Sequence, residues 1–286
     1  MSRLPVWLRK TPPKLGRGSE IREILKRSSL SSVCEEALCP NRAECYGDGT
    51  ATFLLLGDRC NRGCLYCGVE SGVQESPTQK EINELVRVVE EIELDYLVLT
   101  MVTRDDLDDG GSRHIAETVR VLKAHLPNLL VEVLTSDFKG DLSAVRRVVE
   151  SGVDTFAHNI ETVQSVFKRV RALGNYRDSL SILKFVKKEY PLPVKSSIMV
   201  GLGESESEVY NLIETIADIG VDMLTIGQYF QPKPSKIVVM NYITQSQFER
   251  YKVFGEDAGI KIVESAPYVR SSYHASKLFN LKQIAL

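Results

Sequence analysis

The sequence predicts an α/β protein built as a partial (β/α)6 barrel of the TIM type, with an extension at each end. Two observations in the 286 residues predict this class. Short apolar runs, which are typical of buried strands, alternate with longer amphipathic stretches, which are typical of helices that cover a sheet. Gly152, Gly220 and Gly259 follow amphipathic stretches at points where helices commonly end. Six strand–helix units in a row favour a parallel sheet with its helices outside.

The elements are expected in the following order. Residues 1–50 form an N-terminal extension rich in proline and arginine, with a helix at 19–27. The barrel occupies residues 51–230, with strands at 53–56, 96–99, 130–134, 155–159, 194–200 and 223–226. Its helices are expected at 79–92, 112–124, 142–151, 177–189 and 205–219. Residues 231–286 form a C-terminal extension, which contains a further apolar run at 260–264.

The composition is that of an ordinary globular protein. Hydrophobic residues make up 43% and charged residues 26%, and the net charge of −2 gives no support for nucleic-acid binding. No apolar run approaches the roughly 20 residues that cross a bilayer. The basic, proline-containing start has no apolar core like that of a signal peptide. We therefore expect a cytoplasmic protein with neither a nucleic-acid nor a membrane partner, in which clustered cysteines bind metal rather than form disulfides.

The predicted strands end in polar segments, which indicates a functional face. These segments are residues 57–60, 100–111, 135–137, 158–161, 201–204 and 227–229. The carboxyl ends of barrel strands meet at one face, where active sites of such barrels lie. We expect one mouth at this face, with a cysteine loop opening onto it.

All six cysteines lie between positions 34 and 67, in two triplets. Cys60, Cys64 and Cys67 follow the first strand with the spacing Cys-x3-Cys-x2-Cys. Three thiolates can hold three irons of a 4Fe–4S cube and leave the fourth open for a ligand. The alternative is a zinc or redox pair at Cys64 and Cys67. A zinc site would need a fourth nearby ligand, and none of the four histidines lies in the cysteine loops.

The second triplet, with Tyr66 before its last cysteine, resembles the radical S-adenosylmethionine (SAM) superfamily. This resemblance implies that SAM binds the open iron through its amino and carboxylate groups. One electron from the cluster then cleaves SAM to methionine and a 5′-deoxyadenosyl radical. The hard chemistry belongs to the cofactor, and the protein positions and shields it.

The first triplet, Cys34-x4-Cys39-x5-Cys45, resembles the auxiliary-cluster motif of lipoyl synthases. The resemblance extends over residues 5–277 through the blocks GDRCNRGCLYC, TRDDLDDGG, HNIETV, KSSIMVGLGE, DMLTIGQYFQP and VRSSYHA. It implies two 4Fe–4S clusters and S-adenosyl-L-methionine as cofactors. The N-terminal extension would supply the auxiliary-cluster cysteines, and the C-terminal extension would supply a serine as fourth ligand. We expect Ser272 in that role, with Ser271 as the alternative.

The resemblance also implies a sulfurtransferase reaction in which no side chain acts as acid or base. Two sulfur atoms enter at C6 and C8 of an octanoyl chain on a carrier-protein lysine, and the auxiliary cluster is sacrificed as their source. The implied partners are octanoylated lipoyl carrier domains or the glycine-cleavage H protein, with ferredoxin or flavodoxin as reductant. The alternatives are another two-cluster sulfur-inserting radical SAM enzyme, such as a methylthiotransferase or a biotin-synthase-like protein, and a non-catalytic iron–sulfur electron-transfer protein.

Several further residues are expected to contact the cofactor or the acyl chain. They are Tyr66, Gly110, Gly111, Asn159, Glu161, Lys195 and Gln228. The two glycines would let the backbone approach SAM closely, and Asn159 and Glu161 would hydrogen-bond to it. Lys195 and Arg171 would meet carboxylates. His158 is expected to be a satisfied core histidine rather than a ligand.

Overall fold

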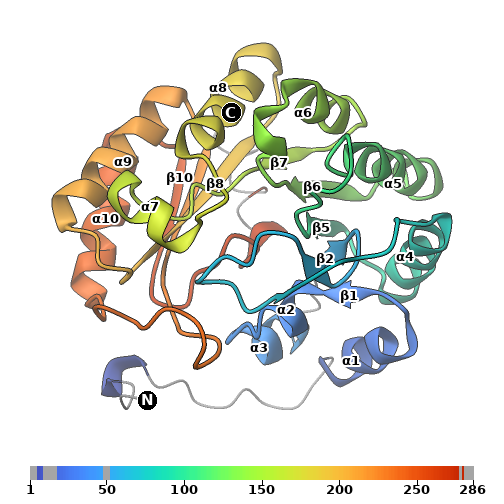
Figure 1. Ribbon diagram of the computed structural model, residues 1–286, viewed down its shortest axis with the longest axis horizontal. Helices are drawn as coiled ribbons and strands as arrows, with labels where there is room; N and C mark the ends of the chain where they lie inside the picture. The colour runs from blue at the N-terminus through green and yellow to red at the C-terminus, as the bar shows by residue number, and fades with distance from the viewer. Residues whose placement is uncertain (1–4, 9–17, 48–51, 277–278, 280–286) are drawn as a thin grey trace.

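The structure, a computed structural model, describes residues 5–8, 18–47, 52–276 and 279. Its main sheet is eight-stranded, in the order β1-β2-β5-β6-β7-β8-β9-β10. These strands are β1 (Ser31–Ser32), β2 (Thr52–Leu55), β5 (Tyr96–Met101), β6 (Leu130–Leu134), β7 (Thr155–Ala157), β8 (Val194–Val200), β9 (Met223–Gln228) and β10 (Ile262–Ser265). Only the β1–β2 pair is antiparallel. Within the described residues the curled sheet stays open between β1 and β10, which confirms the predicted partial barrel (Figure 1).

Helices cover the outside of the sheet, and two short ones lie on its open side (Figure 1). The outer helices are α4 (Gln79–Ile92), α5 (Ser112–His125), α6 (Leu142–Val149), α8 (Tyr176–Glu189), α9 (Glu206–Ile219) and α10 (Gln245–Asp257). The N-terminal segment forms η1 (Val6–Leu8), α1 (Gly18–Arg27), α2 (Val33–Glu36) and α3 (Arg42–Gly47). The remaining elements are β3 (Arg59–Cys60), β4 (Glu70–Ser71), η2 (Phe138–Gly140) and α7 (Gln164–Val170).

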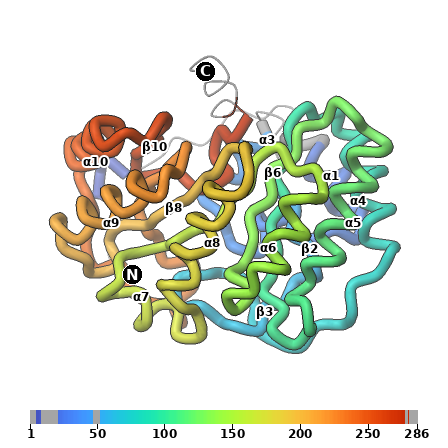
Figure 2. The backbone as a smooth tube through the Cα atoms, turned by 90° about the horizontal axis from the view of Figure 1, so that it is seen from above, coloured from blue at the N-terminus to red at the C-terminus, as the bar shows by residue number. Residues whose placement is uncertain are grey.

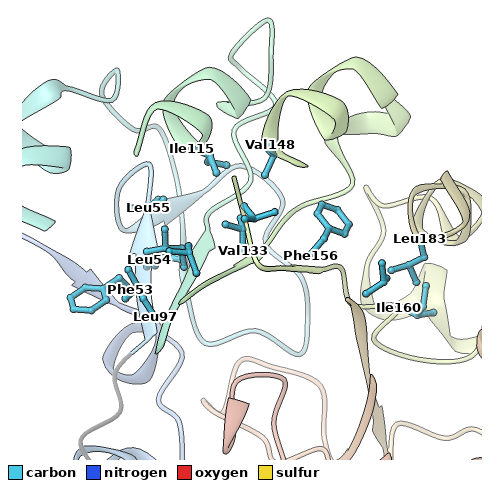
Figure 3. Close-up of a cluster of buried hydrophobic side chains, with 14 of the residues drawn as sticks. Phe53, Leu54, Leu55, Leu97, Ile115, Val133, Val148, Phe156, Ile160 and Leu183 are labelled. Atoms are coloured by element: carbon cyan, nitrogen blue, oxygen red, sulfur yellow. The ribbon is translucent and has the colours of Figure 1, made fainter. Parts of the chain in front are cut away.

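One hydrophobic core joins the strands to the outer helices (Figure 3). Val133 of β6 and Phe156 of β7 are almost fully buried, and so are Ile115 of α5 and Val148 of α6. The same core includes Ile21 of α1, so the N-terminal extension packs directly against the barrel. Burying apolar side chains on both faces of a parallel sheet is what the near-continuous apolar strands predict.

The structure adds two strands to the six predicted for the barrel, the short antiparallel β1 at one edge and β10 at the other. The apolar run at 260–264 contributes to β10, which pairs in parallel with β9 through Ile262 and Met223. The fourth strand is shorter than predicted, because the chain turns away after Ala157 and reaches a positive φ of 74° at Glu161. Helix α7 follows that turn and was not predicted. No helix among the described residues combines the length and the apolar character needed to cross a membrane.

Candidate functional site

The second cysteine triplet lies on a loop that a short parallel strand pair closes. β3 and β4 pair Cys60 with Ser71, and the Gly72 N–H donates to the Cys60 carbonyl at 3.2 Å. Within the loop, the Cys67 N–H donates to the Cys64 carbonyl at 3.2 Å, which keeps these two cysteines close. β3 and α7 lie at the same edge of the molecule in Figure 2. The loop therefore lies at the carboxyl ends of the strands, as predicted.

Arg62 ties this loop to two neighbouring strand ends. Its Nη1 donates to Asp137 Oδ2 at 2.6 Å, and its Nε and Nη2 donate to the Asp105 carboxylate at 2.8 and 3.0 Å. Arg171 donates to the same Asp137 oxygen at 3.2 Å. Burial acts to raise the pKa of Asp137, but the hydrogen bond from Arg62 and the charge of Arg171 outweigh it and lower that pKa to about 2. Arg62 was not predicted, although its place between Cys60 and Cys64 was a usable signal.

The first cysteine triplet is held by two short helices. Cys34 lies in α2, whose N-cap residue Ser32 accepts a hydrogen bond from the Cys34 N–H at 3.2 Å. The Cys39 N–H donates to the Cys34 carbonyl at 3.2 Å. Cys45 lies in α3, and its N–H donates to the Asn41 carbonyl at 2.9 Å. The three cysteines are therefore placed by backbone hydrogen bonds within residues 32–45.

The C-terminal segment packs against this first triplet. Asn41 Nδ2 donates to the Tyr268 carbonyl at 2.5 Å, and the Tyr273 hydroxyl donates to Glu44 Oε1 at 2.5 Å. These contacts span 227 and 229 positions of the chain. The two extensions, which were predicted to build one site together, therefore touch on both sides of the serine pair at 271 and 272.

A cavity of about 870 Å³ lies where the cysteine loops and the C-terminal segment meet. Its lining includes four cysteines, two serines and one carboxylate, namely Cys34, Cys39, Cys45, Cys67, Ser271, Ser272 and Glu161. Gly68 follows the second triplet, and Ala37 lies within the first. A Cβ added to Gly68 would lie 2.7 Å from the Ala37 carbonyl oxygen, so the two cysteine loops are in close contact beside the cavity. Cys60 and Cys64 are outside the described lining. The cavity thus joins the first triplet to one member of the second.

None of the six cysteines forms a disulfide. Burial raises the pKa of Cys34 and of Cys64, and it raises the pKa of Cys67 to about 12. A reactive redox thiol needs a lowered pKa, whereas a bound metal deprotonates a coordinating thiol outright. The donor set therefore suits metal–thiolate binding better than the redox pair considered above. No three Cys, His, Asp or Glu side chains among the described residues are grouped to bind a single metal ion.

A buried polar group lies beside the second triplet. The Glu161 carboxylate accepts hydrogen bonds from Asn159 and Tyr66, and burial raises its pKa. The Glu161 backbone bridges to β8, where its N–H donates to the Ser197 carbonyl at 3.0 Å and its carbonyl accepts from the Met199 N–H at 2.7 Å. Three predicted cofactor contacts are therefore brought together: Tyr66 and Glu161 line the cavity, and Asn159 lies beside Glu161 outside the described lining.

Several buried polar atoms near this group have no hydrogen-bond partner. Those on the cysteine loop and at the ends of β6 and β7 are Asn61 Oδ1, Thr135 Oγ1, His158 Nε2, Asn159 Oδ1 and Thr162 Oγ1. Each unsatisfied buried polar group costs about 1–3 kcal/mol of stability. A polar ligand such as SAM could form the missing hydrogen bonds, so these atoms are consistent with a site for it. The prediction that His158 is satisfied is wrong for its Nε2, since only Nδ1 is bonded, to the Thr135 carbonyl at 2.9 Å.

Four other predicted contacts lie elsewhere. Gly110 and Gly111, with φ of 61° and 86°, begin α5 and are outside the described lining of the large cavity. Lys195 is the second residue of β8, and its Nζ contacts both Glu132 oxygens at 3.0 Å. Gln228 Nε2 donates to the Val200, Tyr229 and Asn241 carbonyls. The structure brings none of these four to the cavity wall.

The fold and the cysteine loop define a radical SAM protein. The profile of the Radical SAM superfamily matches residues 54–216, which span β2 to α9. Solved structures share the fold alone. A methylornithine synthase is 14% identical with a TM-score of 0.56, over 90% of this chain and 85% of its own. The hydrogenase maturase HydG is 12% identical with a TM-score of 0.59, over 80% and 54%.

Within that superfamily, the chain belongs to the lipoyl synthase family, an enzyme family of sulfurtransferases. It is 45% identical over 283 residues to the chloroplastic lipoyl synthase of Arabidopsis thaliana, covering 96% of this chain and 72% of that one. It is 44% identical over 283 residues to the lipoyl synthase of Halorubrum lacusprofundi, covering 97% and 91%. The family assignment confirms the resemblance in the sequence, and it implies SAM and iron–sulfur clusters as cofactors.

Proposed function

We propose that this chain inserts two sulfur atoms at C6 and C8 of an octanoyl chain carried on a lysine of a carrier protein. The observation that carries the proposal is the single cavity that the first triplet, Cys67 and the C-terminal serines share. Breaking a C–H bond and adding sulfur to the same carbon require both reagents to reach one place. A cavity lined by both cysteine groups supports this arrangement.

Two 4Fe–4S clusters are proposed, with separate ligand sets. Cys60, Cys64 and Cys67 would hold the SAM cluster, and the first triplet with Ser272 would hold the auxiliary cluster that is consumed as sulfur source. Ser271 stays the alternative, because both serines line the cavity. A serine oxygen is a harder ligand than a thiolate and suits an iron–sulfur site poorly. A ligand of that kind is easily released, which fits a cluster that is taken apart.

Tyr66, Asn159 and Glu161 are proposed to bind SAM. When bound, SAM and its reduced cluster supply the one-electron chemistry that breaks unactivated C–H bonds. The side chains then need only to hold the ligand, orient it and exclude water. The hydrogen bonds of Glu161 with Asn159 and Tyr66, and the buried Asn159 Oδ1 that has no partner, support that role. Contacts from Gly110, Gly111, Lys195 and Gln228 stay untested predictions.

The apolar part of the cavity is proposed to hold the octanoyl chain. It is formed by Val33, Leu38, Met199, Phe230, Val238 and Val239. Burying each methylene contributes about 0.8 kcal/mol, so an eight-carbon chain gains useful binding free energy there. The proposed partners are octanoylated lipoyl carrier domains or the glycine-cleavage H protein, with ferredoxin or flavodoxin as electron donor.

The test is anaerobic reconstitution with iron and sulfide, followed by mass spectrometry after reaction with dithionite, SAM and an octanoyl-lysine peptide. We expect a mass gain for two sulfurs and two 5′-deoxyadenosines for each product. Deoxyadenosine with an unchanged peptide would reject this substrate and favour another sulfur-inserting radical SAM enzyme. Intact clusters that yield no deoxyadenosine would favour the electron-transfer alternative.

A further inference from the structure

Arg270 is a half-buried cation in the wall of the large cavity. It precedes the serine pair, and it lines the cavity together with Ser271, Ser272 and Cys39. Among the described residues that line this cavity, no other side chain is a lysine, arginine or histidine. The cavity wall therefore has one fixed positive charge, placed beside the proposed auxiliary-cluster ligands.

The Arg270 side chain is held in place without a carboxylate. Its Nη1 donates to the Pro267 carbonyl at 3.4 Å and to the Val269 carbonyl at 2.6 Å, and its guanidinium carbon lies 5.4 Å from the centre of the Phe230 ring. Gly227 makes room for this segment, because a Cβ there would lie 2.1 Å from the Val269 carbonyl oxygen. These contacts fix the guanidinium but leave its charge uncompensated.

A charge that is partly removed from water and has no counter-charge is unfavourable. No Asp or Glu in the described part of the chain forms an ion pair with Arg270, unlike Arg62, Arg104 and Arg171, whose buried guanidinium groups all do. Desolvation of an unpaired charge is expensive, so buried charges are normally paired or bound to a ligand. Cys39, a member of the first triplet, lines the same cavity as Arg270, so a negatively charged group bound there would supply the missing counter-charge.

We infer that Arg270 is the charge partner of the auxiliary cluster, and that its guanidinium offsets the negative charge of the group bound by the first triplet and Ser272. The inference rests on the proposed function. A nearby positive charge stabilises the more negative, reduced form of a cluster, and local charge is among the factors that set cluster potentials. Arg270 thereby keeps the auxiliary cluster bound and raises its reduction potential.

The test is a redox titration of the reconstituted full-length protein, followed by electron paramagnetic resonance. The auxiliary signal is the one that remains in a Cys64→Ala variant. In Arg270→Gln we expect reduction of that cluster to become at least tenfold less favourable, a shift of about 59 mV to more negative potential for a one-electron couple. Arg270→Lys keeps the charge and should recover most of the shift. Arg177→Gln removes an exposed arginine and should change nothing.

Several outcomes distinguish the inference from a purely structural role. An unchanged potential in Arg270→Gln, or equal shifts in the Gln and Lys variants, would overturn it. If Arg270→Gln loses the auxiliary cluster and Arg270→Lys keeps it, the charge is required and the inference is supported. Loss from both variants would mean that the shape of the side chain matters, and would overturn it. A wild-type protein that binds only one cluster would instead overturn the proposed function.

Discussion

Arg62 Nη1 lies 2.6 Å from Asp137 Oδ2, and both side chains are only 2% exposed. The pair joins the loop of the second cysteine triplet to the residues after β6. Because Arg171 reaches the same carboxylate from the end of α7, three segments around the barrel mouth converge on Asp137. The loop that carries Cys60, Cys64 and Cys67 is therefore fixed by charge as well as by the β3–β4 pair.

Replacing Arg62 with Leu should strongly destabilise the protein. The change leaves a buried carboxylate with one of its two cations, and breaking a buried ion pair costs about 3–5 kcal/mol. Urea unfolding of both proteins measures the difference. The control is Arg120→Leu, whose side chain is 51% exposed and lies 3.8 Å from Glu117, so its effect should stay within about 0.5 kcal/mol. An equal loss of unfolding free energy in the two variants would show that the Arg62–Asp137 pair stabilises the protein no more than an exposed ion pair does.

Replacing Gly68 with Ala should separate the two cysteine loops. The new Cβ would lie 2.7 Å from a backbone oxygen, that of Ala37, so one loop must move at a cost of about 1–3 kcal/mol. We expect less bound iron and slower sulfur insertion. Gly72→Ala is the matched control, because its Cβ would meet only the flexible Arg59 side chain at 3.2 Å. Iron and sulfide analysis of the reconstituted variants checks this, and normal cluster content in Gly68→Ala would contradict it.

Stability should fall as the pH drops from 6.5 toward 4 because of His158. Burial, helped by the charge of Arg171, lowers the pKa of His158 from 6.5 to about 4. Below pH 6.5 His158 binds a proton in the unfolded chain but stays neutral in the folded protein, so lowering the pH favours unfolding. Between pH 6.5 and 5.0 the loss should be about 2 kcal/mol larger in wild type than in His158→Gln. Urea unfolding at the two pH values measures this loss. An equal loss of unfolding free energy in wild type and His158→Gln would contradict the prediction.

Mutations in the two cysteine triplets should have different effects on the reaction. Cys64→Ala should abolish SAM cleavage and leave the auxiliary cluster in place. Cys39→Ala should still form 5′-deoxyadenosine but insert no sulfur. Chromatographic assay of deoxyadenosine and mass spectrometry of the peptide separate these results, with circular dichroism to verify folding. Lipoyl product from the Cys39 variant would show that the ligand assignment is wrong.

The serine pair offers the sharpest comparison. Ser272→Ala should alter the resonance signal of the auxiliary cluster and lower product formation, because a proposed iron ligand is lost. Ser271→Ala removes the hydroxyl of the neighbouring serine and should leave both the resonance signal and the product formation unchanged. The reverse pattern would assign the ligand to Ser271.

The barrel was predictable because each strand and helix has its own local pattern. The place of β10 was not, since its pairing with β9 depends on how the chain returns after α10. Helix α7 escaped notice because seven residues are too few to show a clear helical period. The early end of β7 follows from the bend at Glu161, which a local strand pattern does not reveal.

The place of the second cysteine triplet at the barrel mouth was predictable, because these cysteines directly follow the first barrel strand in the sequence. The contacts of Lys195 were not. As the second residue of β8 it lies toward the amino ends of the strands, where Glu132 pairs with it, far from the mouth. Gln228 does end its strand, but its amide is used to hold the chain near Asn241. Which polar groups meet a ligand and which meet each other is decided by tertiary packing.

The contact between Tyr273 and Glu44 also has a consequence for biosynthesis. During translation the first cysteine triplet leaves the ribosome well before the segment that completes its cavity, because the contacting residues are 227 and 229 positions apart. A nascent chain can fold its barrel before the wall formed by residues 266–273 exists. Any site that needs this wall is therefore completed only after residue 273 has been synthesised, and a chain truncated before Tyr268 would lack the wall beside its first cysteine triplet.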